Sequence, residues 1–150
     1  MTQVVSIEPV VKSVTVRCSQ ERAFEVFTRE IGTWWPTETH ALHPGRVAEV
    51  VIEERDGGEW YEIAVDGERG HIGTVLAWEP PARLLVSWEV SSDHPATEIE
   101  VLFSAIDGGT RVDLEHRGWE RLGDAATDVR GSYDEGWTFV LGRYEGGVTG

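Results

Sequence analysis

Two polar residues occupy positions where the alternation of side chains predicts the buried face of a strand. In "TRVDLEHRG" the face that carries Leu114 also carries His116, because successive side chains of a strand point to opposite sides. In "GGEWYEIAV" the face that carries Trp60 also carries Glu62. A carboxyl group and an imidazole in an apolar environment can bind a polar group or exchange a proton, so Glu62 and His116 are the candidate pair for acid or base chemistry.

Each of these residues also has an ordinary structural explanation. His116 is expected to be hydrogen-bonded to backbone or to the hydroxyl of Tyr133, because buried polar groups are nearly always paired, or else to contact a ligand. For Glu62 two phases of the strand remain open, since an inward Tyr61 would leave Glu62 in solvent. An inward Glu62 would have to be neutral, paired or hydrated, because an unpaired buried carboxylate is costly.

Two further histidines stand close together in "HALH". His40 and His43 have a spacing found in metal sites, but they follow Pro36 in an expected loop where no third ligand can be identified. We therefore predict that both are surface residues and that no metal ion binds. The sequence contains no phosphate-binding loop, no Gly-x-Gly-x-x-Gly and no Gly-x-Ser-x-Gly, so no cofactor is predicted.

The composition is that of one globular domain and disfavours several classes of partner. The chain has 150 residues, with 13 Lys and Arg against 27 Asp and Glu, and a formal net charge of -14. This charge repels phosphate backbones and anionic lipids, so neither nucleic acid nor a membrane is an expected partner. The sequence has no signal-peptide pattern and no apolar run of membrane-spanning length, so the protein is expected to be cytoplasmic.

Residue periodicity predicts an α+β chain of about seven strands and two helical segments. Period-two alternation predicts strands at 10–18, 47–55, 59–65, 70–78, 83–90, 97–106 and 110–117, and short links favour antiparallel neighbours. A short helical segment follows the first strand, with Ser19 as its N-cap. From residue 120 on, a long amphipathic helix is predicted by the stripe of Val129, Tyr133, Trp137, Val140, Leu141 and Tyr144.

Four segments, in order along the chain, carry a recognisable pattern. They are "AFEVFTREIGTWWP", "GTVLAWEPPARLLVSW", "GTRVDLEHRGW" and "DEGWTFVLGRY". Together they resemble the START-like superfamily, also called SRPBCC, and are most similar to the branch named for activators of the heat-shock-protein ATPase. The resemblance implies one domain over residues 1–150 with the helix-grip fold, in which a curved antiparallel sheet wraps around a long C-terminal helix.

The helix-grip fold implies a cavity between the sheet and the last helix. Trp34 and Trp35 would lie near one mouth of it. For Trp34 two alternatives remain open, the core and the cavity wall, whereas Trp35 is expected to line the cavity. The strand phases turn further large side chains inward. The predicted ligand-binding residues are Trp35, Trp60, Glu62, Trp88, Phe103, His116, Tyr133 and Trp137.

Three function classes follow from the resemblance and from these residues. The first is a binding module whose cavity takes an apolar small molecule, aromatic or lipid-like, with a few polar groups that fix its orientation. The second is a co-chaperone-like interaction domain with a heat-shock chaperone as partner. Under each reading we expect a monomer or a weak homodimer. The third is an enzyme of the polyketide cyclase type. We expect the first, and no catalytic residue is predicted.

Overall fold

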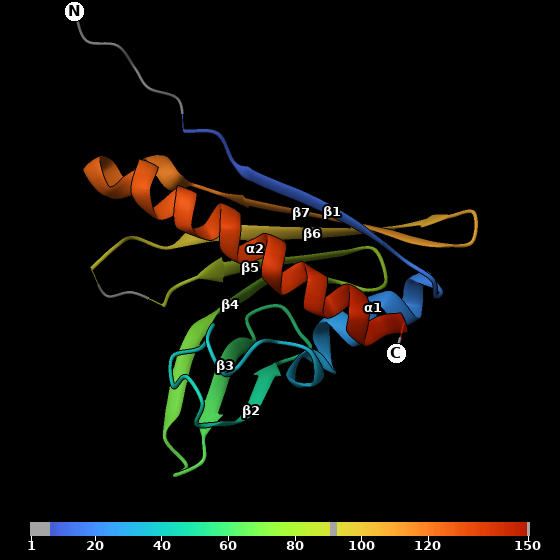
Figure 1. The fold of residues 1–150 in the computed structure, drawn as a ribbon, viewed down its shortest axis with the longest axis horizontal. Coiled ribbons are helices and arrows are strands. Elements are labelled where there is room, and N and C mark those ends of the chain that lie inside the picture. The colour runs from blue at the N-terminus through green and yellow to red at the C-terminus, as the bar shows by residue number, and fades with distance from the viewer. Residues whose placement is uncertain (1–6, 91–92, 150) are drawn as a thin grey trace, which may run out of the picture.

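The computed structural model describes residues 7–90 and 93–149, which form one antiparallel sheet and the helices packed on it (Figure 1). The seven strands of this described part have the order β1-β7-β6-β5-β4-β3-β2. Their bounds are β1 (Val10–Val16), β2 (Val47–Ile52), β3 (Glu59–Ala64), β4 (Arg69–Glu79), β5 (Arg83–Trp88), β6 (Thr97–Ile106) and β7 (Gly109–Arg117). The first and last strands pair at one edge, so the N-terminal strand completes the sheet.

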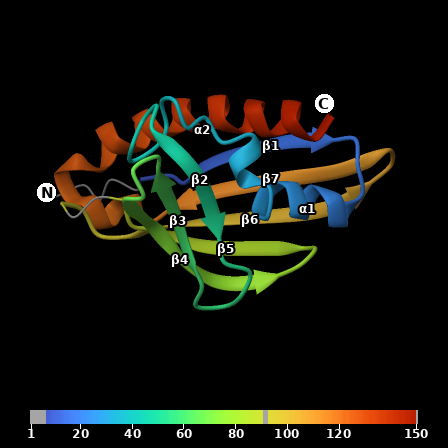
Figure 2. The same ribbon diagram turned by 90° about the horizontal axis from the view of Figure 1, so that it is seen from below.

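The helices lie in two places along the chain. α1 (Gln20–Thr28) and the 3-10 helix η1 (Ile31–Thr33) follow β1, and the 3-10 helix η2 (Trp119–Ala125) leads into α2 (Ala126–Thr149). Figures 1 and 2 show α2 running along one face of the curved sheet, with α1 near its C-terminal end. This arrangement is the predicted helix-grip fold, and the α+β class is confirmed.

The end of the molecule next to α1 is densely packed. The Ser19 side chain accepts a hydrogen bond from the backbone N–H of Arg22 at 3.1 Å, which is the predicted N-cap. Trp34 fills the core at this end, and its Nε1 donates to the carbonyl of Val26 at 2.8 Å. The alternative in which Trp34 plugs the core is therefore the correct one.

Packing, rather than intrinsic propensity, holds α2 in place. Gly131, Gly136 and Gly142 all lie within it, and a glycine inside a helix costs about 1 kcal/mol relative to alanine. The compensating buried stripe consists of Trp137, Val140, Leu141 and Tyr144. Among the described residues, no helix combines the length and the apolarity that crossing a bilayer requires.

Candidate functional site

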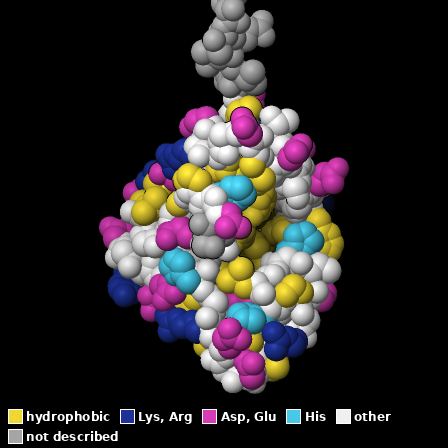
Figure 3. Space-filling view, turned by 90° about the vertical axis from the view of Figure 1, so that its left-hand side faces the viewer, with side chains coloured by type: hydrophobic (Ala, Val, Ile, Leu, Met, Phe, Trp, Pro, Cys, Tyr) yellow, Lys and Arg dark blue, Asp and Glu magenta, His cyan; other side chains and the backbone are white. Residues whose placement is uncertain are grey.

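A cavity of about 300 Å³ opens between α2, the sheet and the loop that joins η1 to β2. Figure 3 shows a hollow floored by hydrophobic side chains, with histidine and acidic side chains around it. The wall includes residues of α2, of β3, β4 and β5, and of the loop. Five predicted ligand-binding residues line this cavity, namely Trp35, Glu62, Trp88, Tyr133 and Trp137.

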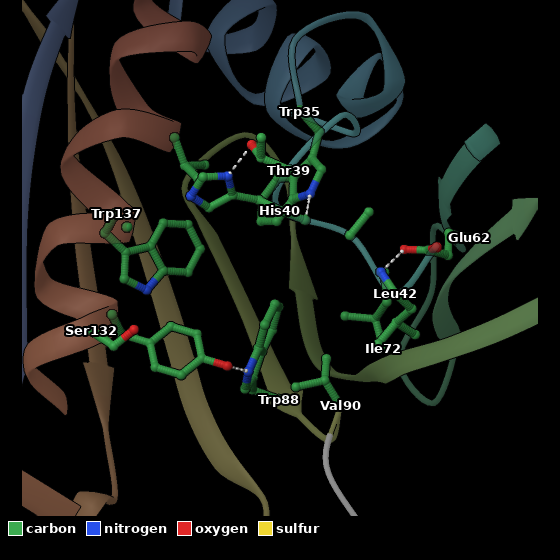
Figure 4. A pocket seen from close by; sticks show the side chains of 14 residues that line it. Trp35, Thr39, His40, Leu42, Glu62, Ile72, Trp88, Val90, Ser132 and Trp137 are labelled. Atoms are coloured by element: carbon green, nitrogen blue, oxygen red, sulfur yellow. Dashed lines mark hydrogen bonds between the residues drawn. The ribbon is translucent and has the colours of Figure 1, made fainter. Parts of the chain in front are cut away.

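The aromatic part of the wall is ordered by ring contacts and by the hydrogen bonds that its tryptophans donate. Trp88 Nε1 donates to the hydroxyl of Tyr133 at 2.7 Å and so joins β5 to α2 (Figure 4). Trp137 meets Trp35 edge to face, with ring centroids 5.9 Å apart. Burial raises the pKa of the Tyr133 phenol against a smaller opposing effect of the Trp88 hydrogen bond, so the hydroxyl keeps its proton at neutral pH. These rings give a flat ligand a fixed apolar surface to stack on.

Glu62 is the polar residue of the strand-side wall, and it points inward. Its neighbours on the same face of β3, Trp60 and Ala64, are buried as well, so the phase with Trp60 inward is the correct one. The backbone N–H groups of Leu42 and His43 donate to Oε1 and Oε2 at 2.9 and 2.8 Å. His43 Nδ1 lies 2.7 Å from Oε2. The carboxylate is therefore paired, and it fastens the loop to β3.

The prediction that His40 and His43 are surface residues is wrong. The His43 side chain is only 12% exposed, because its ring packs against the Glu62 carboxylate. The His40 ring lines the cavity and stacks on Phe139 of α2, with ring centroids 5.1 Å apart. Within residues 7–90 and 93–149, no group of three or more His, Cys, Asp or Glu is placed to hold a metal ion.

His116 is fully buried, but it lies outside the lining of the cavity. Trp137 Nε1 donates to Nδ1 at 3.0 Å, and the other ring nitrogen lies 2.7 Å from the Thr97 hydroxyl. Since Nδ1 accepts, Nε2 carries the hydrogen and donates to Thr97. Burial lowers the pKa of His116 to about 3, so the ring is neutral. The Tyr133 hydroxyl, one of the two partners considered for His116, instead accepts from Trp88. Glu62, the other member of the candidate acid-base pair, is hydrogen-bonded to His43 and not to His116.

Residues 17–143 match the family described as Activator of Hsp90 ATPase homolog 1-like protein. The chain belongs to this family. Among solved structures, the anthrahydroquino-gamma-pyrone synthase Txn09, complexed with SUM, is 34% identical over 95% of this chain and 97% of that chain, with a TM-score of 0.65. The self-sacrificing resistance protein CalC from Micromonospora echinospora is 29% identical over 95% and 94%, with a TM-score of 0.70. No curated protein matches the chain.

In this member of the Hsp90-ATPase-activator-like family, two more of the predicted ligand-binding residues lie outside the cavity lining. Trp60 is buried behind the wall, with its ring centroid 5.5 Å from that of Trp35 and 5.3 Å from that of Trp88. Its Nε1 is a buried donor without a hydrogen-bond partner among the residues described. Phe103 packs at the α1 end, 5.1 Å from Phe24 between ring centroids. Large inward side chains thus serve the packed core as well as the cavity.

Several lining residues of this family member escaped the sequence analysis. On the loop they are Thr39, His40, Ala41 and Leu42, and elsewhere they are Ile72, Val90, Ser132, Gly136 and Val140. No periodic pattern marks the loop residues, because the loop is shaped by its hydrogen bonds to Glu62. On α2 the sequence did contain a usable pattern. Ser132, Gly136 and Val140 are spaced four residues apart, so they share the helix face that lines the cavity.

Proposed function

We propose that this protein binds a planar aromatic small molecule in the cavity between α2 and the sheet. The observation that carries the proposal is a cavity of about 300 Å³ with the rings of Trp35, Trp88, Tyr133 and Trp137 in its wall. This volume is at the lower end of the range typical of small-molecule sites, which is about 300–1,000 Å³. A flat ring system uses such a site well, because aromatic faces and edges gain from stacking in addition to their buried area.

Similarity to Txn09 supports the aromatic character of the ligand. The name of that protein describes a synthase of an anthrahydroquino-gamma-pyrone, a fused planar ring system, and its chain is 34% identical to this one. Binding of a fused ring system is a requirement that a carrier and a synthase have in common. The proposal therefore concerns binding, and it does not depend on a chemical step.

The test is a titration of the protein with 1,8-dihydroxyanthraquinone while tryptophan fluorescence is recorded. Three tryptophans line the cavity, so a ligand bound there quenches their emission, with a dissociation constant well below about 1 mM. A Cβ at Gly136 would lie 3.9 Å from the His40 ring, an ordinary contact, so Gly136→Leu adds its remaining atoms within the cavity wall. We expect Gly136→Leu to weaken binding about tenfold or more, which is at least 1.4 kcal/mol.

The matched control is Gly142→Leu, the same change on an exposed side of the same helix. A Cβ at Gly142 meets no atom within 4 Å, so this variant should bind like the parent protein. Absence of quenching in the parent protein up to about 1 mM ligand would refute the proposal. Equal loss of binding in the two variants would refute the location in this cavity.

A co-chaperone role is the second candidate, and the family match over residues 17–143 is the observation that favours it. It predicts that the protein accelerates ATP hydrolysis by Hsp90 and that it does so without any aromatic ligand. The measurement is the Hsp90 ATPase rate with and without the protein. An unchanged rate, together with quenching by the anthraquinone, would leave the ligand-binding function standing and remove this candidate.

A further inference from the structure

Glu62 lines the cavity, and its carboxylate can accept more hydrogen bonds than its protein partners donate. Its side chain is only 2% exposed, yet it forms part of the cavity wall. Oε2 accepts from the backbone and the ring of His43, whereas Oε1 accepts a single hydrogen bond from the described residues, from the backbone N–H of Leu42 at 2.9 Å. A carboxylate oxygen has two lone pairs, so Oε1 retains the capacity to accept a hydrogen bond from a ligand.

The charge around Glu62 is not balanced by the protein. In the described part of the chain, no Lys or Arg side chain forms an ion pair with this carboxylate. His43 is its partner, but the other ring nitrogen of His43 lies 3.6 Å from the Glu68 carboxylate. One imidazole is thus shared by two carboxylates, so the cluster contains more acidic than basic groups.

The rest of the cavity selects against an anionic ligand group. Glu62 is the one carboxylate in the described lining, and no Lys or Arg lines the cavity. The formal net charge of -14 adds a negative potential at long range, which attracts cations and repels anions. A cationic ligand group would meet an opposite charge in a partly dehydrated site, where ionic hydrogen bonds are roughly twice as strong as neutral ones.

The apolar and the charged parts of the wall lie on different sides of the cavity. Figure 4 places Trp137 and Ser132 on α2 at one side and Glu62 with Leu42 at the other, with Trp88 between them. We propose that the ligand is an aromatic compound with a protonated amine, that its rings stack on the aromatic wall, and that its amine binds the Glu62 carboxylate. This inference rests on the proposed function, because it assigns the chemical class of the ligand for the same cavity.

The test compares three anthracenes that differ in one substituent and in charge. They are 9-(aminomethyl)anthracene, a cation at pH 7.5, the neutral 9-(hydroxymethyl)anthracene, and the anion anthracene-9-carboxylate. Quenching of tryptophan fluorescence gives the three dissociation constants for the parent protein. We expect the amine to bind about tenfold or more tightly than the alcohol, and the carboxylate to bind more weakly than the alcohol.

Glu62→Gln removes the charge and retains one acceptor oxygen. We expect it to lower the ratio of amine to alcohol affinity to near one; the ratio is the readout because any shift of the loop that Glu62 holds affects both compounds. The matched control is Glu68→Gln, which removes the same charge from an exposed carboxylate that contacts His43 outside the cavity lining. Glu68→Gln should keep the preference of the parent protein for the amine.

The outcomes separate this inference from the function on which it rests. If the alcohol binds as tightly as the amine, or if Glu62→Gln keeps the preference, the assignment of an amine is wrong while the aromatic-binding function stands. If none of the three compounds binds, the proposed function itself is wrong.

If Glu62→Gln does not fold, the affinities of the parent protein for the amine and the alcohol are compared in 0.5 M NaCl. A preference from contact with Glu62 persists at that salt concentration, and its loss would overturn the assignment, since salt screens only the long-range charge efficiently.

Discussion

His116 is a buried histidine with both ring nitrogens occupied, and among the described residues no ion pair stabilises an imidazolium. Trp137 donates to Nδ1 and Nε2 donates to Thr97, so protonation of Nδ1 would break the first of these hydrogen bonds. Burial lowers the pKa of this ring to about 3, whereas the ordinary value is 6.5. Between these two values the unfolded chain binds a proton that the folded protein does not bind.

This difference predicts a pH dependence of stability with a definite sign. The stabilisation from a neutral His116 is complete above about pH 6.5 and is lost as the pH falls toward 3, because protons then favour the unfolded chain. The loss attributable to His116 is at most about 1.4 kcal/mol per pH unit. We expect His116→Asn, whose amide oxygen can accept from Trp137, to be less stable at pH 7.5 but to lack this slope.

Urea unfolding at pH 7.5, 6.5, 5.5 and 5.0 measures the effect for both proteins. The range stops at pH 5.0 because most surface carboxylates begin to protonate below it. If the parent protein and His116→Asn lose stability in parallel between pH 6.5 and 5.0, then His116 is not the group responsible.

Residue orientation was predictable from the sequence, whereas residue partners were not. The period of two placed His116 on an inward face, where it is buried, whereas it left two phases open for the strand that carries Trp60 and Glu62. It could not identify the partner of Glu62, because His43 is 19 residues away on a loop without periodic structure. It could not separate cavity from core either, since an inward Phe103 looks the same in the sequence whether other side chains or a ligand fill the space beside it.

At the level of elements, α2 shows where substitution of glycine should help and where it should not. Gly142 has no atom within 4 Å of an added Cβ, whereas a Cβ at Gly147 would lie 3.1 Å from the Cβ of Trp34. Gly142→Ala should therefore raise the free energy of unfolding by about 0.5–1 kcal/mol, from helix propensity alone. Gly147→Ala should gain less or lose stability, because the buried Trp34 would have to shift.

Thermal melts of the two alanine variants test this difference. For a chain of this size a gain of 1 kcal/mol corresponds to about 2–4 °C in the melting temperature. A larger rise for Gly147→Ala than for Gly142→Ala would show that the contact between α2 and Trp34 is looser than the structure indicates.

The sequence predicted the ends of an element correctly where the alternation of side chains continues to its last residue. The sixth strand was predicted at 97–106, and β6 spans Thr97–Ile106. The second strand was predicted to run to residue 55, but β2 ends at Ile52. At Glu53 the backbone N–H still donates to the Glu59 carbonyl, while the backbone N–H of Glu59 donates to the Glu53 carboxylate. Side-chain hydrogen bonds to backbone can end a strand in ways that periodicity does not reveal.

The whole molecule divides into a packed end and an open end that share one helix. Near α1, the rings of Phe24, Phe27, Phe103 and Tyr144 form a continuous aromatic cluster. Toward the other end of α2, the rings of Trp88, Tyr133 and Trp137 also contact one another, but they line a cavity, and its wall includes the half-buried Val90. Since interior packing dominates stability, the packed end should carry most of it and the open end should carry ligand binding.

Two truncations, one at each end, test this division. Phe103→Ala removes a ring that is 2% exposed and contacts two other phenylalanines, so it should cost about 3–5 kcal/mol and lower the melting temperature by roughly 6–20 °C. Val90→Ala removes two methyl groups that face the cavity, so it should cost below about 1.5 kcal/mol. Binding of 1,8-dihydroxyanthraquinone should respond in the opposite way, with a weaker affinity for Val90→Ala and an unchanged affinity for Phe103→Ala well below its melting temperature. Loss of binding by a folded Phe103→Ala would mean that the cavity depends on packing at the far end of α2, and the two ends would then have to be treated as one cooperative unit.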